Sequence, residues 1–145
     1  MQTLRVSDLM VEGVATLRPG DNIAILNDLM SSRQIRHVPI VDSDGDLVGL
    51  VSHRDMLRHV LSNASELPMS AQRELLRHIR VEEIMIADPE TTEPDSDLCD
   101  AAQVMLENKY GCLPVVEGAR LVGILTEADF VRYVAERICR PREGG

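Results

Sequence analysis

The chain has 145 residues, a formal net charge of −9 and 2% aromatic residues. The length is that of about one domain. The acidic charge argues against duplex nucleic acid as a partner, and the scarcity of aromatic side chains argues against single-stranded nucleic acid. The sequence has no apolar stretch typical of a membrane span and no signal-peptide pattern, so no membrane association is expected. Three widely spaced cysteines without a C-x-x-C pair favour reduced thiols in the cytoplasm over disulfides or a zinc site.

The first elements expected along the chain are an apolar lead-in at residues 4–10 and an extended segment at 14–17. Pro19 and Gly20 interrupt the chain, and Asp21 or Asn22 can cap the helix that follows. The apolar stripe of this helix is formed by Ile25, Leu26, Leu29 and Met30.

A β-hairpin is expected next, followed by a second helix. The β-branched run at 37–41 predicts a buried strand, and residues 47–51 predict its return strand. In the turn between them, Asp44 and Gly45 are expected to supply positive φ angles. The helix that begins at Ser52 carries apolar residues at Leu57, Val60 and Leu61.

The second half of the chain repeats this order after a polar connector. A short helix is expected at 69–79, with Leu75, Leu76 and Ile79 facing inward. Asp97 begins a helix that carries Leu98, Ala101, Ala102 and Met105. Residues 113–116 and 121–125 predict a second hairpin. A last helix from Thr126 places Phe130, Val131, Val134 and Ile138 on one stripe.

The two halves share a sequence pattern. Residues 49–55 and 123–129 each read as glycine, two apolar residues, a hydroxyl residue, two variable positions and an aspartate. Pro39 and Pro114, in the apolar runs upstream, lie 75 positions apart, and Asp55 and Asp129 lie 74 apart. The matches continue back to residues 6–10 and 81–85, so the chain contains an internal duplication.

The duplicated motifs resemble a tandem pair of cystathionine-β-synthase (CBS) domains, called a Bateman module. The resemblance covers residues 3 to 138 and implies an α/β fold of two β-α-β-β-α repeats, packed with pseudo-two-fold symmetry. The expected boundaries are 1–62 for the first CBS repeat, 63–80 for a connector with a short helix, 81–139 for the second repeat and 140–145 for a polar tail.

The resemblance also implies two clefts between the repeats for adenosine-containing ligands: AMP, ADP, ATP, S-adenosylmethionine or a dinucleotide. Asp55 and Asp129 would hold ribose hydroxyls, and Ser52 and Thr126 would lie against ribose or phosphate. The full set of expected ligand-binding residues is Thr16, Arg36, His37, Pro39, Ser52, His53, Arg54, Asp55, Thr91, Gly111, Cys112, Pro114, Thr126 and Asp129.

The residue chemistry supports a ligand role but also allows a structural one. An ionised carboxylate accepts hydrogen bonds from two vicinal hydroxyls, and the N–H groups at a helix start suit an anion. Gly49 and Gly123 lack a Cβ, so another group can approach the backbone closely there. However, Ser52 with Asp55, and Thr126 with Asp129, also have the spacing of helix capping boxes.

We therefore expect a stand-alone regulatory module and not an enzyme, with no catalytic residues, no metal and no required cofactor. Its ligand would be an adenine nucleotide or S-adenosylmethionine, and its output would pass to an unidentified effector protein by a shift between conformations. A homodimer is expected through the apolar helix faces. The alternative is a constitutive dimerisation or interaction scaffold with no physiological ligand.

The two expected sites differ in charge. Arg36, His37, His53 and Arg54 surround the first motif, whereas Gly111, Cys112, Glu127 and Ala128 occupy the equivalent positions of the second. The cations of the first site can neutralise phosphate, whereas the Glu127 carboxylate of the second would repel it. Phosphate is therefore expected at the site that contains Asp55. The Asp129 site is expected to stay empty or to take a less negative ligand, such as S-adenosylmethionine.

Overall fold

A computed structural model describes residues 3–64 and 66–139 of the chain, so the expected polar tail lies outside the described residues. Helices and strands are mixed, as the α/β expectation requires. The chain forms two compact units. One unit covers residues 15–89, and the other joins the N-terminal segment up to Val14 to the segment from Glu90 onward.

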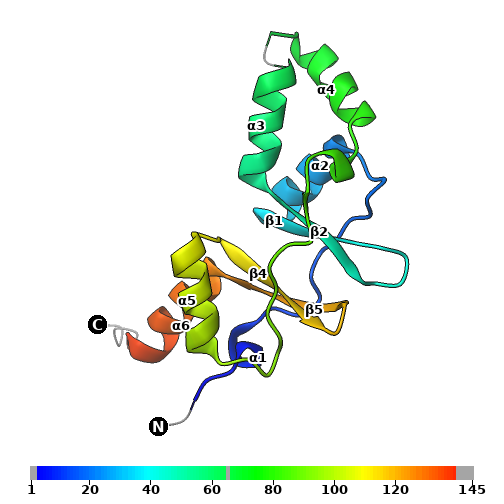
Figure 1. Ribbon diagram of the computed structural model, residues 1–145. Helices are drawn as coiled ribbons and strands as arrows, with labels where there is room; N and C mark the ends of the chain where they lie inside the picture. Colours follow the sequence, from blue (N-terminus) through cyan, green and yellow to red (C-terminus); the bar gives the residue numbers. More distant parts are fainter. Residues whose placement is uncertain (1–2, 65, 140–145) are drawn as a thin grey trace. The chain divides into compact units, whose positions relative to one another are not determined.

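The unit at 15–89 contains a three-stranded antiparallel sheet in the order β1-β2-β3. Figure 1 shows α3 and α4 side by side within this unit. Its elements are α2 (Ile23–Arg33), β1 (His37–Val41), β2 (Leu47–Ser52), α3 (His53–Ala64), α4 (Met69–His78), the 3₁₀ turn η1 (Val81–Glu83) and β3 (Ile86–Ala87).

Helix α2 begins at an Asn22 cap, since the Asn22 side chain accepts a hydrogen bond from the Ile25 N–H at 3.0 Å. Gln34 ends the helix in the left-handed conformation. The stripe predicted for α2 is partly wrong. Leu26 and Met30 are buried and Leu29 is half-buried, but Ile25 is 44% exposed while Ile23 is fully buried.

The β1–β2 turn is held by Asp42, whose carboxylate accepts the N–H groups of Asp44 and Asp46 at 2.9 and 3.0 Å. Only Gly45 has a positive φ in this turn, at 86°. The expectation of a second positive φ at Asp44 is therefore wrong. Asp42 holds the turn through its side chain, so a two-residue primed turn is not needed.

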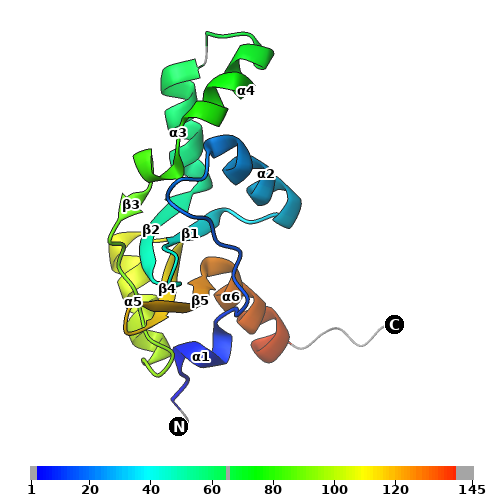
Figure 2. The same ribbon diagram turned by 90° about the vertical axis from the view of Figure 1, so that its right-hand side faces the viewer.

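The other unit contains the two-stranded antiparallel sheet β4-β5. Its elements are α1 (Val6–Leu9), α5 (Leu98–Asn108), β4 (Cys112–Glu117), β5 (Arg120–Thr126), α6 (Glu127–Tyr133) and the π-helical turn η2 (Val134–Ile138). Asp97 caps α5 by accepting two N–H groups, as expected. In Figure 2, α5 and α6 can both be followed against the β4–β5 hairpin.

The lead-in segments are exchanged between the repeats. Val6, at the start of the first repeat, is fully buried in the core of the second, with Leu113 and Leu125. Val81, at the start of the second repeat, is fully buried in the core of the first. Equivalent hydrogen bonds hold both lead-ins: the Val6 N–H donates to Ser96 O at 2.9 Å, and the Val81 N–H donates to Asp21 O at 2.8 Å.

The glycines of the two closing motifs receive the exchanged lead-ins. A Cβ placed on Gly49 would collide with the Sδ of Met85, and one on Gly123 would lie 3.0 Å from the Sδ of Met10. The expected close approach to these glycines is therefore confirmed, and the approaching group in each case is a methionine of the other repeat.

The apolar stripe expected on the last helix is mostly unpaired within its unit. Phe130 packs against the core, but Val131, Val134 and Ile138 are 67%, 44% and 67% exposed. On α3, Leu57 and Leu61 are also exposed. The sequence pattern correctly predicts an apolar face on α3 and on the last helix. Within its unit, however, each helix buries only part of that face.

Candidate functional site

The first candidate site lies at the open end of the β1–β2 hairpin, away from the turn. His37 pairs with Ser52 across the two strands, and the His53 N–H donates to Arg36 O at 2.7 Å. These bonds bring residues 36–37 of one strand beside residues 52–53 of the other. The β1–β2 register thus positions four of the predicted site residues at one end of the sheet.

The segment containing Thr16 runs along the free edge of β1. The Leu17 N–H donates to Pro39 O at 3.2 Å, and the Val41 N–H donates to Leu17 O at 2.9 Å. Leu17 forms a parallel bridge with Ile40, and residues 14–17 form no longer strand. Because the pairing is parallel, Thr16 lies beside the buried Pro39, on the same hairpin as His37 and Ser52.

Asp55 lies in the first turn of α3, above this hairpin end. The Ser52 Oγ accepts the Asp55 N–H at 3.0 Å, while the Ser52 N–H reaches the Asp55 Oδ2 only at 3.4 Å. The capping-box geometry is therefore present, although its return bond is long. The Ser52 N–H is the one donor to the Asp55 carboxylate among the described residues, so most of the acceptor capacity of this carboxylate is unused. Asp55 is also half-buried and therefore accessible to a ligand.

Two arginines of this site carry unpaired charges. Arg36 and Arg54 are both exposed, and among residues 3–64 and 66–139 neither guanidinium has an ion-pair or hydrogen-bond partner. His37 and His53 are half-buried. The first site consequently combines an open carboxylate with two cations, which is a suitable arrangement for a molecule that carries both hydroxyl and phosphate groups.

The second candidate site has the same backbone scaffold. Cys112 pairs with Thr126, the Glu127 N–H donates to Gly111 O at 3.1 Å, and the Thr92 N–H donates to Pro114 O at 3.0 Å. Thr91 directly precedes Thr92 and is exposed, whereas Cys112 and Pro114 are buried. Each predicted set of site residues is thus brought together within its own compact unit.

The Asp129 carboxylate differs from that of Asp55 because both of its oxygens accept short hydrogen bonds. Its Oδ2 accepts the Thr126 N–H at 2.8 Å and the Thr126 hydroxyl at 3.1 Å. Its Oδ1 pairs with the Arg132 guanidinium at 3.0 Å. The Asp129 side chain is 2% exposed, so these contacts replace water around it.

The second site is also poorer in cations. Burial, together with the nearby Glu127 carboxylate, raises the pKa of the Cys112 thiol to about 12. A hydrogen bond with Glu90, assisted by partial desolvation, raises the pKa of the Tyr110 hydroxyl above its usual value. The carboxylates behind these shifts are Glu90 and Glu127, which stand where the first site has Ala15 and His53. Both carboxylates disfavour a negatively charged group on a ligand.

Sequence reasoning missed three residues of the second site: Glu90, Tyr110 and Arg132. The i, i+3 spacing of Asp129 and Arg132 on a predicted helix was a usable signal for their ion pair. The contact between Glu90 and Tyr110 joins positions 20 residues apart, and nothing in the local sequence indicates it.

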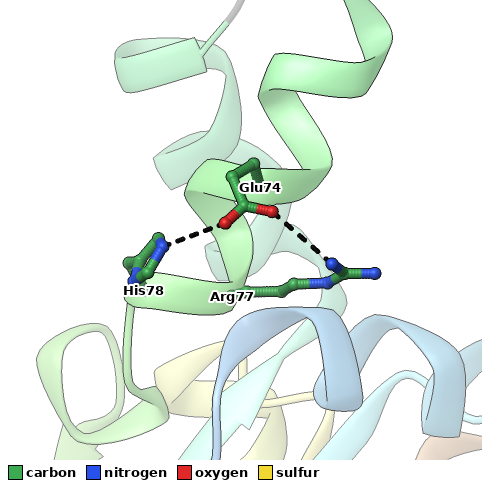
Figure 3. Close-up of polar contacts among 3 residues, drawn as sticks. All are labelled: Glu74, Arg77 and His78. Carbon is green, nitrogen blue, oxygen red and sulfur yellow. Dashed lines mark hydrogen bonds and ion pairs between the residues drawn. The ribbon is translucent and has the colours of Figure 1, made fainter.

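A further polar cluster lies on α4, in the connector. Glu74 contacts His78 Nε2 at 3.2 Å and Arg77 Nη1 at 3.5 Å (Figure 3). All three side chains are more than half exposed, and their i, i+3 and i, i+4 spacing is that of a solvated helix face. No group of three metal-ligating side chains was found among the described residues. Nor does any helix in the described ranges have the length and apolar character needed to cross a membrane.

A family model for the CBS domain matches residues 6–62 and 81–136. In sequence, the chain is 30% identical to a CBS domain-containing protein of Dictyostelium discoideum, over 87% of this chain and 88% of that protein. It is 32% identical to a homoserine O-acetyltransferase of Methanohalobium evestigatum. The chain spans between 24% and 42% of the first four curated relatives it matches, and 24% of that acetyltransferase.

Solved structures agree over nearly the full length. The CBSX2 protein of Arabidopsis thaliana, in a crystal structure with AMP, has a TM-score of 0.77 and 27% identity, with 90% of this chain and 95% of that chain covered. The CBS domain pair of protein MJ0100, crystallised with 5′-methylthioadenosine and S-adenosyl-L-methionine, has a TM-score of 0.79 and 25% identity. That match covers 92% of this chain and 98% of the other.

Proposed function

The chain belongs to the CBS domain family, and from that premise we propose that it is a regulatory module that binds an adenosine-containing ligand. The observation that carries the proposal is the open carboxylate of Asp55, at a hairpin end that also presents Ser52 and two arginines without an ion-pair partner in the described ranges. Support also comes from the two related structures, one crystallised with AMP and one with S-adenosyl-L-methionine.

In this proposal each group of the first site has a chemical role. The Asp55 carboxylate accepts hydrogen bonds from the two vicinal hydroxyls of a ribose. Ser52 lies against the ribose or phosphate, and Arg36, Arg54 and His53 offset the phosphate charge. Thr16 lies toward the base. We therefore assign AMP, ADP or ATP to the first site and expect phosphate to be disfavoured at the second.

We further propose that the chain acts in the cytoplasm without catalysing a reaction. Ligand binding would favour one conformation, which an effector protein recognises. The acetyltransferase relative gives no support for an enzyme here, since the chain matches only 24% of its length. A ligand can shift such an equilibrium only by its difference in affinity for the two conformations.

A thermal-shift screen followed by calorimetry tests the ligand. AMP, ATP, S-adenosylmethionine and NAD are the probes, and a ligand at about 100 times its dissociation constant stabilises the fold by roughly 2.7 kcal/mol. Asp55→Ala should weaken AMP binding by roughly ten- to a hundredfold, since a hydrogen bond to a charged group contributes about 1.5–3 kcal/mol.

The matched control is Asp44→Ala, which removes an exposed carboxylate from the opposite end of the same hairpin. It should leave the AMP affinity unchanged. Equal affinity for AMP and 2′-deoxy-AMP would reduce Asp55 to a helix cap. Absence of any shift with all four probes would refute the ligand proposal.

The exposed apolar side chains support self-association as a second property. Leu61 on α3 and Val131 on α6 are 64% and 67% exposed. We propose that these faces form a homodimer, which would also serve the alternative function of a scaffold without ligand. Light scattering should report twice the 16.1 kDa of one chain. Val131→Lys should yield a monomer, whereas Leu106→Lys, on the equally exposed Leu106 of α5, should not.

A further inference from the structure

The closing aspartates of the two repeats occupy equivalent positions but have different partners. The Asp129 carboxylate accepts three hydrogen bonds, the longest of 3.1 Å, and its side chain is 2% exposed. Among residues 3–64 and 66–139, the Asp55 carboxylate accepts one hydrogen bond, at 3.4 Å, and Asp55 is half-buried. A ribose diol needs both an open acceptor and access to it, whereas Asp129 is buried and both of its carboxylate oxygens already accept hydrogen bonds.

Arg132 accounts for much of this difference. Its guanidinium pairs with Asp129 Oδ1 at 3.0 Å while the arginine side chain itself is 55% exposed. It therefore stands between a buried carboxylate oxygen and the solvent. The first repeat has an arginine at the equivalent position, Arg58, yet Arg58 and Asp55 form no ion pair among the described residues. The residue type is the same in both repeats, and the contact exists only in one.

We propose that Arg132 is a specificity-determining residue that closes the second site by occupying its carboxylate. This inference rests on the proposed function of the equivalent carboxylate in the first repeat. A ligand can reach Asp129 only by displacing Arg132, and the exchange costs the protein an ion pair. The carboxylates of Glu90 and Glu127 lie in the same site, so a nucleotide phosphate cannot compensate for that loss.

A second site opened by the loss of Arg132 would bind a different class of ligand from the first. Without Arg132, Asp129 Oδ1 loses its one donor among the described residues, and a ribose hydroxyl can take the place of that donor. The remaining carboxylates favour a ligand without phosphate. The class of ligand is therefore a neutral nucleoside, for which adenosine is the probe, and AMP is the charged comparison.

The test is calorimetry of adenosine and AMP with Arg132→Gln, with Arg58→Gln as the matched control. Wild type should bind AMP at one site per chain, and Arg58→Gln should do the same. Arg132→Gln should gain a second adenosine site, at least about tenfold tighter than any second-site binding in wild type. Adding Asp129→Asn should remove the new site, and Arg132→Lys should keep it closed.

Thermal melting of each variant controls for folding, and the stoichiometry then decides. A folded Arg132→Gln that still binds one adenosine per chain would show that Arg132 only stabilises the helix, and would overturn the inference while leaving the proposed function intact. Two equivalent sites in wild type would also overturn it. If neither protein binds adenosine or AMP, this inference fails, and the thermal-shift results with ATP, S-adenosylmethionine and NAD then decide the proposed function.

Discussion

In the part of the chain that the structure describes, the half-buried Asp55 carboxylate of the first repeat accepts one long hydrogen bond, whereas the second repeat holds Asp129 buried between Thr126 and Arg132. Both lie on the same hairpin-and-helix scaffold, with the same pairing of strand ends. The comparison separates two roles that one motif can combine. The spacing of hydroxyl and aspartate specifies a helix cap, and the neighbouring residues decide whether the carboxylate has capacity left for a ligand.

The largest expected difference between the repeats is in stability. Asp129→Ala should lower the free energy of unfolding by about 2–3 kcal/mol, because it removes a helix cap and the acceptor of the half-buried Thr126 N–H. Asp55→Ala should cost about 1 kcal/mol, as for a partly exposed cap. Urea unfolding of both variants measures this, and equal losses would show that the two carboxylates are structurally alike.

The glycines test the exchanged lead-ins. Gly49→Ala and Gly123→Ala should each cost about 1–2 kcal/mol by overpacking. The remedies should differ. Met85→Ala should recover the larger part of the loss at Gly49, because the methionine side chain is the nearest obstacle and the Ile86 carbonyl oxygen follows at 3.2 Å. Met10→Ala should recover less at Gly123, because the Val11 carbonyl oxygen also lies 3.0 Å from the added Cβ. Double-mutant cycles quantify both couplings, and equal couplings would contradict the asymmetry.

The helix caps of α2 and α5 offer a smaller contrast. Asp97 accepts two N–H groups at 2.7 and 3.1 Å, whereas Asn22 accepts one at 3.0 Å. Asp97→Ala should therefore cost about 1.5 kcal/mol and Asn22→Ala about 1 kcal/mol. Denaturant unfolding curves of the two variants measure these losses, provided that the dependence of the free energy of unfolding on denaturant is the same in both. Asn22→Ala as the more damaging change would mean that the extra N–H of α5 contributes nothing.

The smallest expected effect is the pH dependence from Cys112. Burial and Glu127 raise the pKa of its thiol from 9.0 to about 12, so the folded state disfavours the thiolate. The contribution of this thiol to the free energy of unfolding is therefore fully present below pH 9. It declines as pH rises from 9 toward 12, by about 1 kcal/mol at pH 9.5.

Cys112→Ala should remove this part of the alkaline loss. At pH 8, iodoacetamide should modify the exposed Cys99 and Cys139 before Cys112. Rapid alkylation of Cys112 in the folded protein would mean that its thiol is accessible.

The sequence predicted the elements well, because most of them depend on local signals. Asn22, one of the two expected caps, and Asp97 begin their helices, and both hairpins form from the expected strands. Features that depend on contacts distant in sequence were not predicted. Ile25 was expected on the buried face of α2 but is exposed. The contacts of Gly49 with Met85 and of Tyr110 with Glu90 join residues too far apart for a local sequence pattern to indicate them. The charge difference between the sites was visible in sequence, but the closure of Asp129 was not.

The exchange of lead-ins has a consequence for the history of the chain. A single repeat that kept these contacts would have an empty place in its core where Val81 or Val6 now packs. It could fill that place only by swapping its lead-in with a second copy, as domain-swapped dimers do. Gene duplication would then have turned an encounter between two molecules into one within a single chain, at high effective concentration. By the same logic, a cut within residues 63–80 yields two halves that each lack a segment of their own core, and mixing the two halves should restore both cores.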